Sequence, residues 1–317
     1  MSRLIALTLL CLATFATAED AVRPGLVNER EIMTQLQIFL DQQLFGPGKI
    51  DGRGGEFTVK ALMRYQRSHG LTVTGKLDQN IPLESVYPIY TQFTIGEELF
   101  KFVGNLPSEK AEQQKLKYLP YDCILELLTE RFHCDPELLQ KLNKNVNVDK
   151  LKAGDTVWVP NVDPFLIETM PEMGNLAPLP EFQHRRIKIS RRFRMLELYD
   201  NEALIAAVPI TPGSDTLPTP PGTWKILGIA AMPNFRWDEG VLNHGVRTDK
   251  FYMLPPGPNN PVGVLWCALN KPGIGIHGTN SPQTIGRSAS HGCMRVANWD
   301  VYRLSKMITA GIEVVIE

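Results

Sequence analysis

The sequence predicts a multidomain α+β protein, with helices concentrated in its N-terminal half and short strands in its C-terminal half. The chain has 317 residues, which is more than a single hydrophobic core usually fills. Apolar residues recur at helical spacing after residue 32 and again after residue 124, whereas residues 186–316 alternate short apolar runs with Gly and Pro turns. We therefore expect two or three domains, the last of them mainly β.

The charge balance excludes some partners. The 33 basic and 34 acidic residues nearly cancel, so no broad electrostatic field draws the protein to nucleic acid or to an anionic membrane surface. Hydrophobic residues make up 43% of the chain, which is typical of globular packing. No internal apolar run is long enough to span a bilayer.

The N-terminus has the pattern of a cleavable secretory signal peptide, predicted over residues 1–18. Arg3 precedes an apolar run, and Ala16-Thr17-Ala18 comes just before the acidic Glu19. Cys11 lies inside the apolar run, after the bulky Leu10 where lipid attachment needs a small residue. We expect a soluble exported protein.

Signal cleavage leaves four cysteines, and an oxidising compartment favours their pairing. Cys123 and Cys134 flank one predicted helix, and they either pair or are buried singly. Cys267 lies in an apolar run that reads as a buried strand, whereas Cys293 has polar, glycine-rich neighbours.

Residues 30–82 predict two helices joined by a glycine-rich turn. The turn contains Ile50-Asp51-Gly52, and the second helix stops at His69-Gly70. This order of motifs resembles the small helical peptidoglycan-binding domain, and the resemblance implies contact with the glycan strands of a cell wall. A generic helical hairpin used for packing is the alternative.

Residues 88–162 predict a strand, two helices and a second strand. Asp122 is a candidate cap for the first helix, and Asp135-Pro136-Glu137 predicts the start of the second. The pattern resembles a LysM carbohydrate-binding module of βααβ order, interrupted by a charged insertion at 109–117. That departure leaves two readings open: the module binds glycan, or it supports the next domain.

Residues 163–183 contain four prolines and predict a linker. The C-terminal domain, residues 184–317, follows with short strands and a terminal helix at 298–307. The predicted strands lie at 186–190, 195–199, 203–210, 224–227, 264–269, 275–276 and 313–316. The loop at 233–261, which includes Trp237, His244 and Tyr252, is either a lid or a surface excursion.

The chemistry-bearing residues lie between 277 and 295. His277 ends a predicted strand, and Cys293 lies in the loop Ser-His-Gly-Cys-Met-Arg at 290–295. An imidazole can take the proton of a thiol and hold the pair as thiolate and imidazolium, which makes the sulfur an effective nucleophile. Gly292 allows close approach of backbone amides that could stabilise an oxyanion, and Arg295 could bind a substrate carboxylate.

Each of these residues has a plainer interpretation when taken alone: a buried cysteine, a surface histidine or a solvated arginine. Their coincidence within nineteen positions favours catalysis. A zinc site built from His277, His291 and Cys293 is the main competitor. It ranks lower because the sequence offers neither a spaced cysteine pair nor an obvious general-base carboxylate nearby.

The motif formed by His-Gly-Thr-Asn at 277–280, Ile-Gly at 285–286 and the loop at 290–295 is similar to the signature of the L,D-transpeptidase catalytic domain, of YkuD type. The resemblance covers about residues 184–317 and implies a mainly-β, sandwich-like fold. It implies that Cys293 is the nucleophile and His277 the base.

By the same match, the Gly278 carbonyl orients His277, while His291 and Gly292 shape the oxyanion site. Thr279, Ser290 and Arg295 occupy motif positions that would contact substrate.

The resemblance implies an exported enzyme of the periplasm or cell wall that needs no cofactor or metal. Cys293 would form a thioester with a peptidoglycan stem peptide, release the terminal D-amino acid and pass the acyl group to an acceptor amine. A lipoprotein lysine is another acceptor, water would make the enzyme a carboxypeptidase or endopeptidase, and a non-catalytic wall-binding scaffold is the rival outside enzymes. A thiol of this kind is also an expected target of carbapenems.

Overall fold

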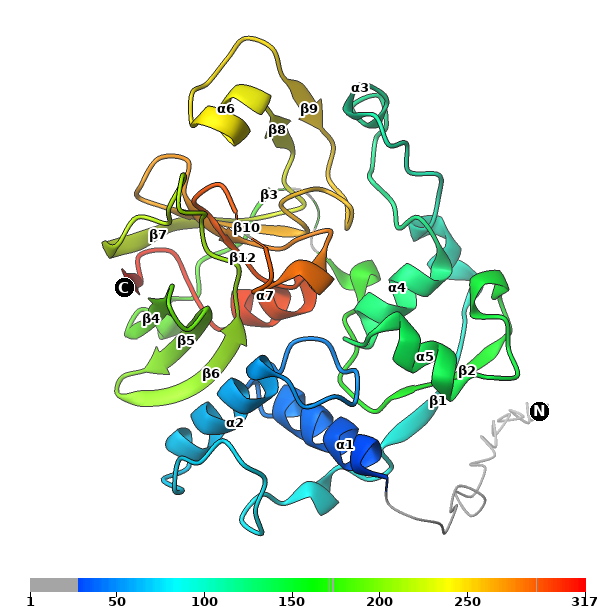
Figure 1. The fold of residues 1–317 in the computed structure, drawn as a ribbon. Helices are drawn as coiled ribbons and strands as arrows, with labels where there is room; N and C mark the ends of the chain where they lie inside the picture. Colours follow the sequence, from blue (N-terminus) through cyan, green and yellow to red (C-terminus); the bar gives the residue numbers. More distant parts are fainter. Residues whose placement is uncertain (1–27, 171, 173, 289) are drawn as a thin grey trace, which may run out of the picture.

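In the computed structural model the chain forms three units packed around one another (Figure 1). The structure describes residues 28–170, 172, 174–288 and 290–317, so the predicted signal peptide at 1–18 and Cys11 lie outside the described residues. The first unit is helical and the third is mainly β, as the sequence predicts, and the second places its helices between two paired strands. Among the described residues, no helix has the length and apolar character needed to cross a bilayer.

The first unit is a pair of helices closed by a turn. Its elements are α1 (Glu29–Gln42), α2 (Glu56–Ser68) and a 3-10 turn (Leu83–Ser85). Phe39 of α1 packs edge-on against Tyr65 of α2, with ring centroids 4.9 Å apart. The buried Gln37 fixes the Ile-Asp-Gly turn, because its side-chain oxygen accepts from the N–H groups of Asp51 at 3.0 Å and Gly52 at 2.8 Å.

The second unit closes a two-stranded antiparallel sheet over two short helices. Its elements are β1 (Tyr90–Thr94), a 3-10 helix (Glu97–Phe102), α3 (Lys110–Gln113), α4 (Ile124–Arg131), α5 (Pro136–Leu142), a 3-10 turn (Val148–Lys150) and β2 (Thr156–Pro160). The cap at Asp135 is confirmed, because its carboxylate accepts from the N–H of Glu137. The prediction that Asp122 caps α4 is wrong, because Cys123 occupies the N-cap position. The Glu126 carboxylate instead accepts a hydrogen bond from the N–H of Asp122 at 2.6 Å.

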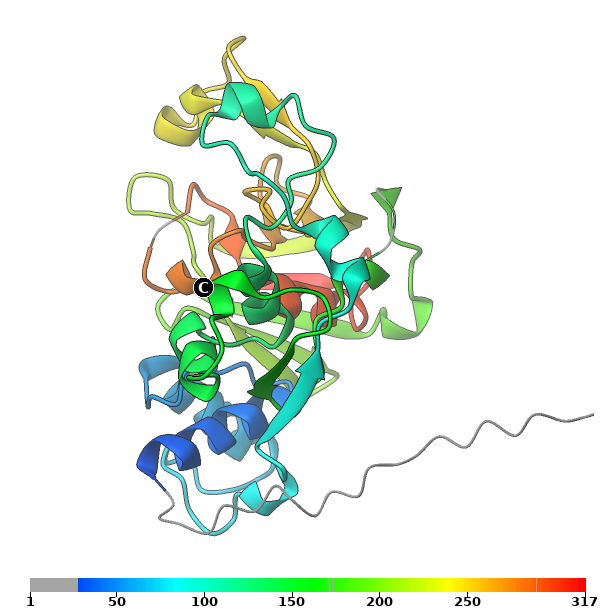
Figure 2. The same ribbon diagram turned by 90° about the vertical axis from the view of Figure 1, so that its right-hand side faces the viewer.

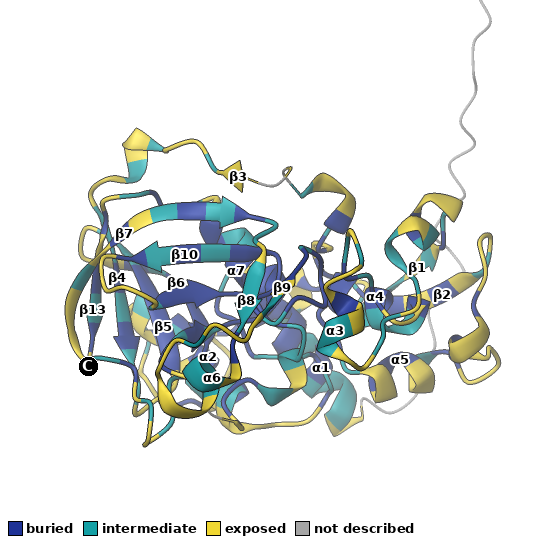
Figure 3. Cartoon of the chain, turned by 90° about the horizontal axis from the view of Figure 1, so that it is seen from above, coloured by how far each residue is buried: buried dark blue, intermediate teal, exposed yellow. Residues whose placement is uncertain are grey.

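The third unit is built on a curled sheet. Among the described residues this sheet has nine strands, eight of them in the order β12-β11-β10-β7-β13-β4-β5-β6, with β3 added beside β7. A bridge between Thr211 and Arg295 joins the chain just after β6 to β12, so the two ends of the sheet meet. Most of β5, β6 and α7 is buried (Figure 3).

The elements of this unit have the following bounds. The strands are β3 (Gly174–Asn175), β4 (Arg185–Ser190), β5 (Met195–Asp200), β6 (Ala203–Pro209), β7 (Gly222–Ala231), β8 (Phe235–Trp237), β9 (Tyr252–Leu254), β10 (Leu265–Leu269), β11 (Gly275–His277), β12 (Met294–Arg295) and β13 (Glu313–Ile316). The helices are α6 (Glu239–His244) and α7 (Asn298–Ser305), with 3-10 turns at Ile167–Thr169, Pro180–Phe182 and Pro282–Thr284.

The predicted linker is held against the domain. Phe165 and Ile167 are buried, and β3 pairs with the edge of β7 at Ala230 and Ala231. The proline pattern indicated an extended path and missed this pairing, because strand addition depends on a distant edge rather than on local sequence.

The loop at 233–261 forms a projecting hairpin of β8 and β9 with α6 at its tip. The charged insertion of the second unit lies beside this hairpin, as two orthogonal views show (Figures 1 and 2). The Lys110 ammonium of α3 lies 4.8 Å from the centre of the Trp237 ring of β8. The insertion therefore packs against the third unit rather than extending into solvent.

A buried polar cluster joins all three units. Asp41 of α1 accepts from Arg303 of α7 at 2.8 Å and from His133, which follows α4, at 3.1 Å. The His133 ring also stacks on Trp299 of α7. Burial alone would raise the pKa of Asp41, but Arg303 and His133 outweigh it and hold that pKa well below its usual range.

Backbone hydrogen bonds also cross between the units. Ile50 donates to the carbonyl of His133 at 2.8 Å, and Leu119 of the second unit donates to Pro256 of the third at 2.8 Å. Gly46 donates to Ala207 at 2.7 Å, which covers the free edge of β6 with the first unit. The three units are therefore docked through main-chain contacts as well as through side chains.

The four cysteines among the described residues are all free thiols. Cys123 is exposed at the start of α4, whereas Cys134 is buried beyond its end. The helix separates the two, so the pairing that the sequence left open is not formed.

We expect Asp41→Asn to lower the free energy of unfolding by about 3–5 kcal/mol at pH 7, because it leaves Arg303 without its buried carboxylate. Since the folded-state pKa of Asp41 is depressed, its stabilisation is present above the unfolded-state value of about 3.9 and is lost as the pH falls further. Urea unfolding at pH 7 and pH 3 measures both effects. Glu202, an exposed carboxylate that pairs with Arg186, provides the control. Glu202→Gln should leave the midpoint of urea unfolding unchanged. Equal midpoints for Asp41→Asn and the control at pH 7 would contradict the prediction.

Candidate functional site

The register of β11 and β12 brings the predicted nucleophile and base together. The two strands run parallel, with Ile276 opposite Met294 and His277 opposite Arg295. Because paired residues share a face and side chains alternate along a strand, His277 and Arg295 are directed to the same face, and so is Cys293, which lies two residues before Arg295. The structure thus unites the three residues that the sequence predicted to carry the chemistry.

The His277 ring is buried and held in one orientation. Its Nδ1 lies 2.6 Å from the carbonyl oxygen of Gly278, which can only accept, so Nδ1 carries the proton and donates. The Nε2 lone pair is then free to act as a base. The ring also stacks on Trp266 of β10, with centroids 5.3 Å apart. Burial lowers the pKa of His277 to about 4, and the nearby Arg295 charge acts in the same direction.

Burial favours the neutral form of the Cys293 thiol. Burial raises its pKa to about 11, although the Gly275 amide and the charge of Arg295 act against that rise. The sulfur donates to the carbonyl of Gly273 at 3.3 Å. Burial therefore disfavours both members of the expected thiolate and imidazolium pair, because each ion loses hydration in this site.

The loop before Cys293 is held by Ser290. The buried Ser290 hydroxyl donates to the carbonyl of Cys293 at 2.5 Å and accepts from the N–H of Gly292 at 3.2 Å. Gly292 has a φ of +107°, a conformation that side chains disfavour. In the described part of the chain, the N–H groups of His291 and Cys293 have no partner. They, rather than the N–H of Gly292, are available to an oxyanion.

Arg295 supplies a cation beside the thiol. Its backbone exchanges hydrogen bonds with Thr211, at 3.0 and 2.9 Å, which anchors β12. Among the described residues, no carboxylate lies within ion-pair distance of its half-buried guanidinium. This cation is suited to a carboxylate of the substrate.

Two further predictions concern side chains near the motif. Thr279 is buried, and its hydroxyl accepts from the N–H of Ser281 at 3.2 Å, so it stabilises the loop rather than lining an open surface. Among the described residues, no three His, Cys, Asp or Glu side chains are grouped to hold a metal ion. In particular, His291 is exposed while His277 is buried, so the donors of the zinc alternative do not converge.

Three residues that the sequence did not predict also contact the site: Trp266, Gly273 and Thr211. Trp266 could have been suspected, because strand alternation places it on the face opposite the buried Cys267. Gly273 and Thr211 carry no local signal, since they contribute backbone groups that only the register brings near Cys293.

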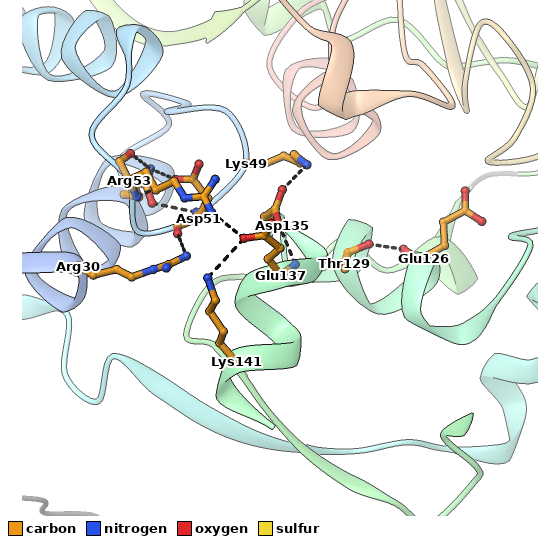
Figure 4. Close-up of polar contacts among 10 residues, drawn as sticks. Arg30, Lys49, Asp51, Arg53, Glu126, Thr129, Asp135, Glu137 and Lys141 are labelled. Carbon is orange, nitrogen blue, oxygen red and sulfur yellow. Dashed lines mark hydrogen bonds and ion pairs between the residues drawn. The ribbon is translucent and has the colours of Figure 1, made fainter. Parts of the chain in front are cut away.

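A cavity of about 410 Å³ lies where the three units meet. Lys49 lines it from the first unit, Glu126 and Glu130 from α4, and Asn280 and Gln283 from the loop that follows His277. Lys49, which lines the cavity, belongs to one of two ion pairs between the first unit and the start of α5 (Figure 4). They join Lys49 to Asp135 and Arg53 to Glu137, each at 2.6 Å.

Comparisons with known proteins agree with this geometry. A family model described as the L,D-transpeptidase catalytic domain matches residues 184–316, and a peptidoglycan-binding domain model matches residues 29–81. A Bacillus licheniformis protein named as the L,D-transpeptidase YkuD is 28% identical over 190 residues, covering 60% of this chain and 91% of its own length. The Bacillus subtilis protein of the same name is 41% identical over 71 residues, covering 22% of this chain and 43% of its own length.

A solved L,D-transpeptidase from Mycobacterium smegmatis has 16% identity and a TM-score of 0.35, covering 42% of this chain and 58% of its own. The family-model and sequence matches identify an enzyme with an L,D-transpeptidase catalytic domain and a peptidoglycan-binding domain.

We expect Arg295→Gln to raise the pKa of Cys293 further, because the variant removes the positive charge that favours the thiolate. Alkylation of Cys293 by iodoacetamide should rise about tenfold per pH unit up to about pH 11 in the unaltered enzyme, and should be roughly three- to tenfold slower in the variant at pH 8. Mass spectrometry of the Cys293 peptide measures both rates. Arg287→Gln, an exposed cation of the same loop, is the control, and identical profiles for the two variants would refute the prediction.

Proposed function

We propose that this L,D-transpeptidase is an exported enzyme that cross-links peptidoglycan through a thioester on Cys293. The observation that carries the proposal is the register of β11 and β12, which directs His277, Cys293 and Arg295 to one face of the sheet. A nucleophile, a base with a fixed tautomer and an unpaired cation then face the same space.

In the first half-reaction, the Nε2 of His277 takes the thiol proton as Sγ attacks the carbonyl carbon before the terminal D-amino acid. The resulting oxyanion accepts hydrogen bonds from the free N–H groups of His291 and Cys293. Collapse breaks the C–N bond, and His277 returns the proton to the departing amine. Because burial favours the neutral form of both groups, little charge has to be stabilised before substrate arrives.

In the second half-reaction, an acceptor amine attacks the thioester carbonyl. The amine gives a proton to His277, the C–S bond breaks, and His277 passes that proton to sulfur to restore the thiol. The energy of the original peptide bond is conserved in the thioester, which suits a compartment without nucleotide triphosphates. Arg295 would bind the carboxylate of the donor peptide and orient its scissile bond.

The peptidoglycan-binding domain would hold the enzyme on its insoluble substrate and raise the local concentration of donor and acceptor. We propose that residues 88–162 are a LysM-like module whose main role is support of the catalytic unit. Its contacts favour that role, because Leu119, His133 and Lys110 all engage other units. The signal-like residues 1–18 would direct export to the periplasm or cell wall.

We expect residues 19–317 to convert disaccharide tetrapeptides into cross-linked dimers with release of the terminal D-amino acid. Cys293→Ala should abolish both products, because no thioester can form. Cys123→Ser, which removes the exposed thiol, should retain full activity. Mass spectrometry distinguishes the outcomes: tripeptide without dimers would mean that water is the acceptor, and dimers from Cys293→Ala would exclude the mechanism. A lysine-containing lipoprotein peptide added as acceptor tests protein anchoring in the same assay.

We also expect carbapenems to acylate Cys293. Their strained amide carbonyl imitates the donor carbonyl, and the opened ring would remain on sulfur as a thioester. Intact-protein mass spectrometry should show one adduct, which peptide mapping assigns to Cys293 and which Cys293→Ala lacks. An unmodified Cys293 after prolonged exposure of enzyme that is active on tetrapeptides would count against this expectation.

A further inference from the structure

A buried carboxyl group of the second unit lies at one end of a hydrogen-bond chain that leads to His277. Glu130, near the end of α4, is only 6% exposed. Tyr121 donates to its Oε2 at 2.5 Å, and Asn298 donates from Nδ2 to its Oε1 at 2.9 Å. Among the described residues, no cation lies within ion-pair distance of this carboxyl. A buried acid without a cation is costly, and burial raises its pKa to about 8.

The second link is Asn298, the first residue of α7. It is fully buried, and its side-chain oxygen accepts from the N–H groups of Thr279 and Val264, both at 3.2 Å. The two ends of one amide are therefore used differently: the nitrogen points to α4 of another unit, and the oxygen points to the catalytic loop.

The third link is the peptide unit between Gly278 and Thr279. Its carbonyl accepts from the Nδ1 of His277 at 2.6 Å, and its N–H donates to Asn298. A peptide unit is planar, so fixing the N–H also fixes the carbonyl. A Cβ at Gly278 would lie 2.1 Å from the Asn298 oxygen, which shows how closely the amide is seated against this peptide.

We propose that Glu130 is a positioning residue for the catalytic histidine, acting through Asn298 and the Gly278–Thr279 peptide. This inference rests on the proposed role of His277 as the base. It makes the second unit part of the catalytic machinery, because α4 supplies a group that orients a residue of β11.

The physical reason lies in the symmetry of the asparagine amide. Rotating the Asn298 amide by half a turn would direct its NH2 group at two N–H donors, Thr279 and Val264. Glu130 offers an acceptor at the opposite end, which only the observed orientation satisfies. The carbonyl of Pro258 also accepts from this NH2 group, but at 3.4 Å. Without Glu130, the amide orientation and the Gly278 carbonyl are held less firmly.

The test compares three variants of residues 19–317. Glu130→Leu removes the acceptor and keeps an apolar side chain of similar size. Glu130→Gln keeps a carbonyl oxygen for Asn298, while the Tyr121 hydroxyl can rotate to accept from the new amide. Glu168→Gln is the matched control, because it weakens the ion pair with the neighbouring Arg131 of α4 and touches nothing in the chain to His277.

Glu130→Leu should lower kcat for tetrapeptide turnover about 10- to 100-fold with little change in KM. Glu130→Gln should stay within a few-fold of the unaltered enzyme, and so should Glu168→Gln. In ¹⁵N NMR of histidine-labelled enzyme, His277 should show one tautomer, protonated at Nδ1, and Glu130→Leu should show a mixture. If Glu130→Leu does not fold, Glu130→Met serves in its place.

Turnover and a His277 spectrum in Glu130→Leu that match those of Glu168→Gln would overturn the inference. So would a Glu130→Gln variant as impaired as Glu130→Leu. The NMR signature does not depend on turnover. A failure of the proposed function, seen as an unaltered enzyme without Cys293-dependent products, can therefore be told apart from a failure of the positioning role.

Discussion

The buried contact of Asp41 with Arg303 and His133 is the constraint on which the arrangement of the units depends. Each of the three side chains comes from a different unit, and Asp41 and His133 are completely buried. Removing a charge from water is costly unless a partner replaces the lost hydration, so undocking any one unit leaves the others unsatisfied. The buried site therefore favours a single mutual arrangement of the units, which the main-chain bonds at Ile50 and Leu119 then reinforce.

Docking extends from this cluster to the loop between the catalytic residues. The ring of Phe57, on α2, lies directly against Gly286, and Arg194 donates to the carbonyl of that glycine. On the other side, the chain from Glu130 reaches the loop at Thr279. The first unit thus contacts the loop between His277 and Cys293 directly, and the second unit reaches it through Asn298. The domain that matches the peptidoglycan-binding family is therefore joined to this loop by packed contacts rather than by a flexible tether.

Burial sets the electrostatic character of the site. It raises the pKa of Cys293 and lowers that of His277, so it favours the uncharged form of each group. A neutral pair avoids the cost of holding two ions away from water. Arg295 complements this arrangement, because it favours the thiolate without offering a proton of its own.

The sequence by itself determined what depends on local backbone chemistry. The His-Gly-Thr-Asn and Ser-His-Gly-Cys-Met-Arg motifs, the Asp135 cap and the last strand could all be recognised, because each acts through neighbours in the chain. Tertiary structure alone decided the free state of Cys123, the pairing of β3 and the path from Glu130 to His277. These features join residues far apart in sequence, and their energies come from desolvation and register, which no local pattern encodes.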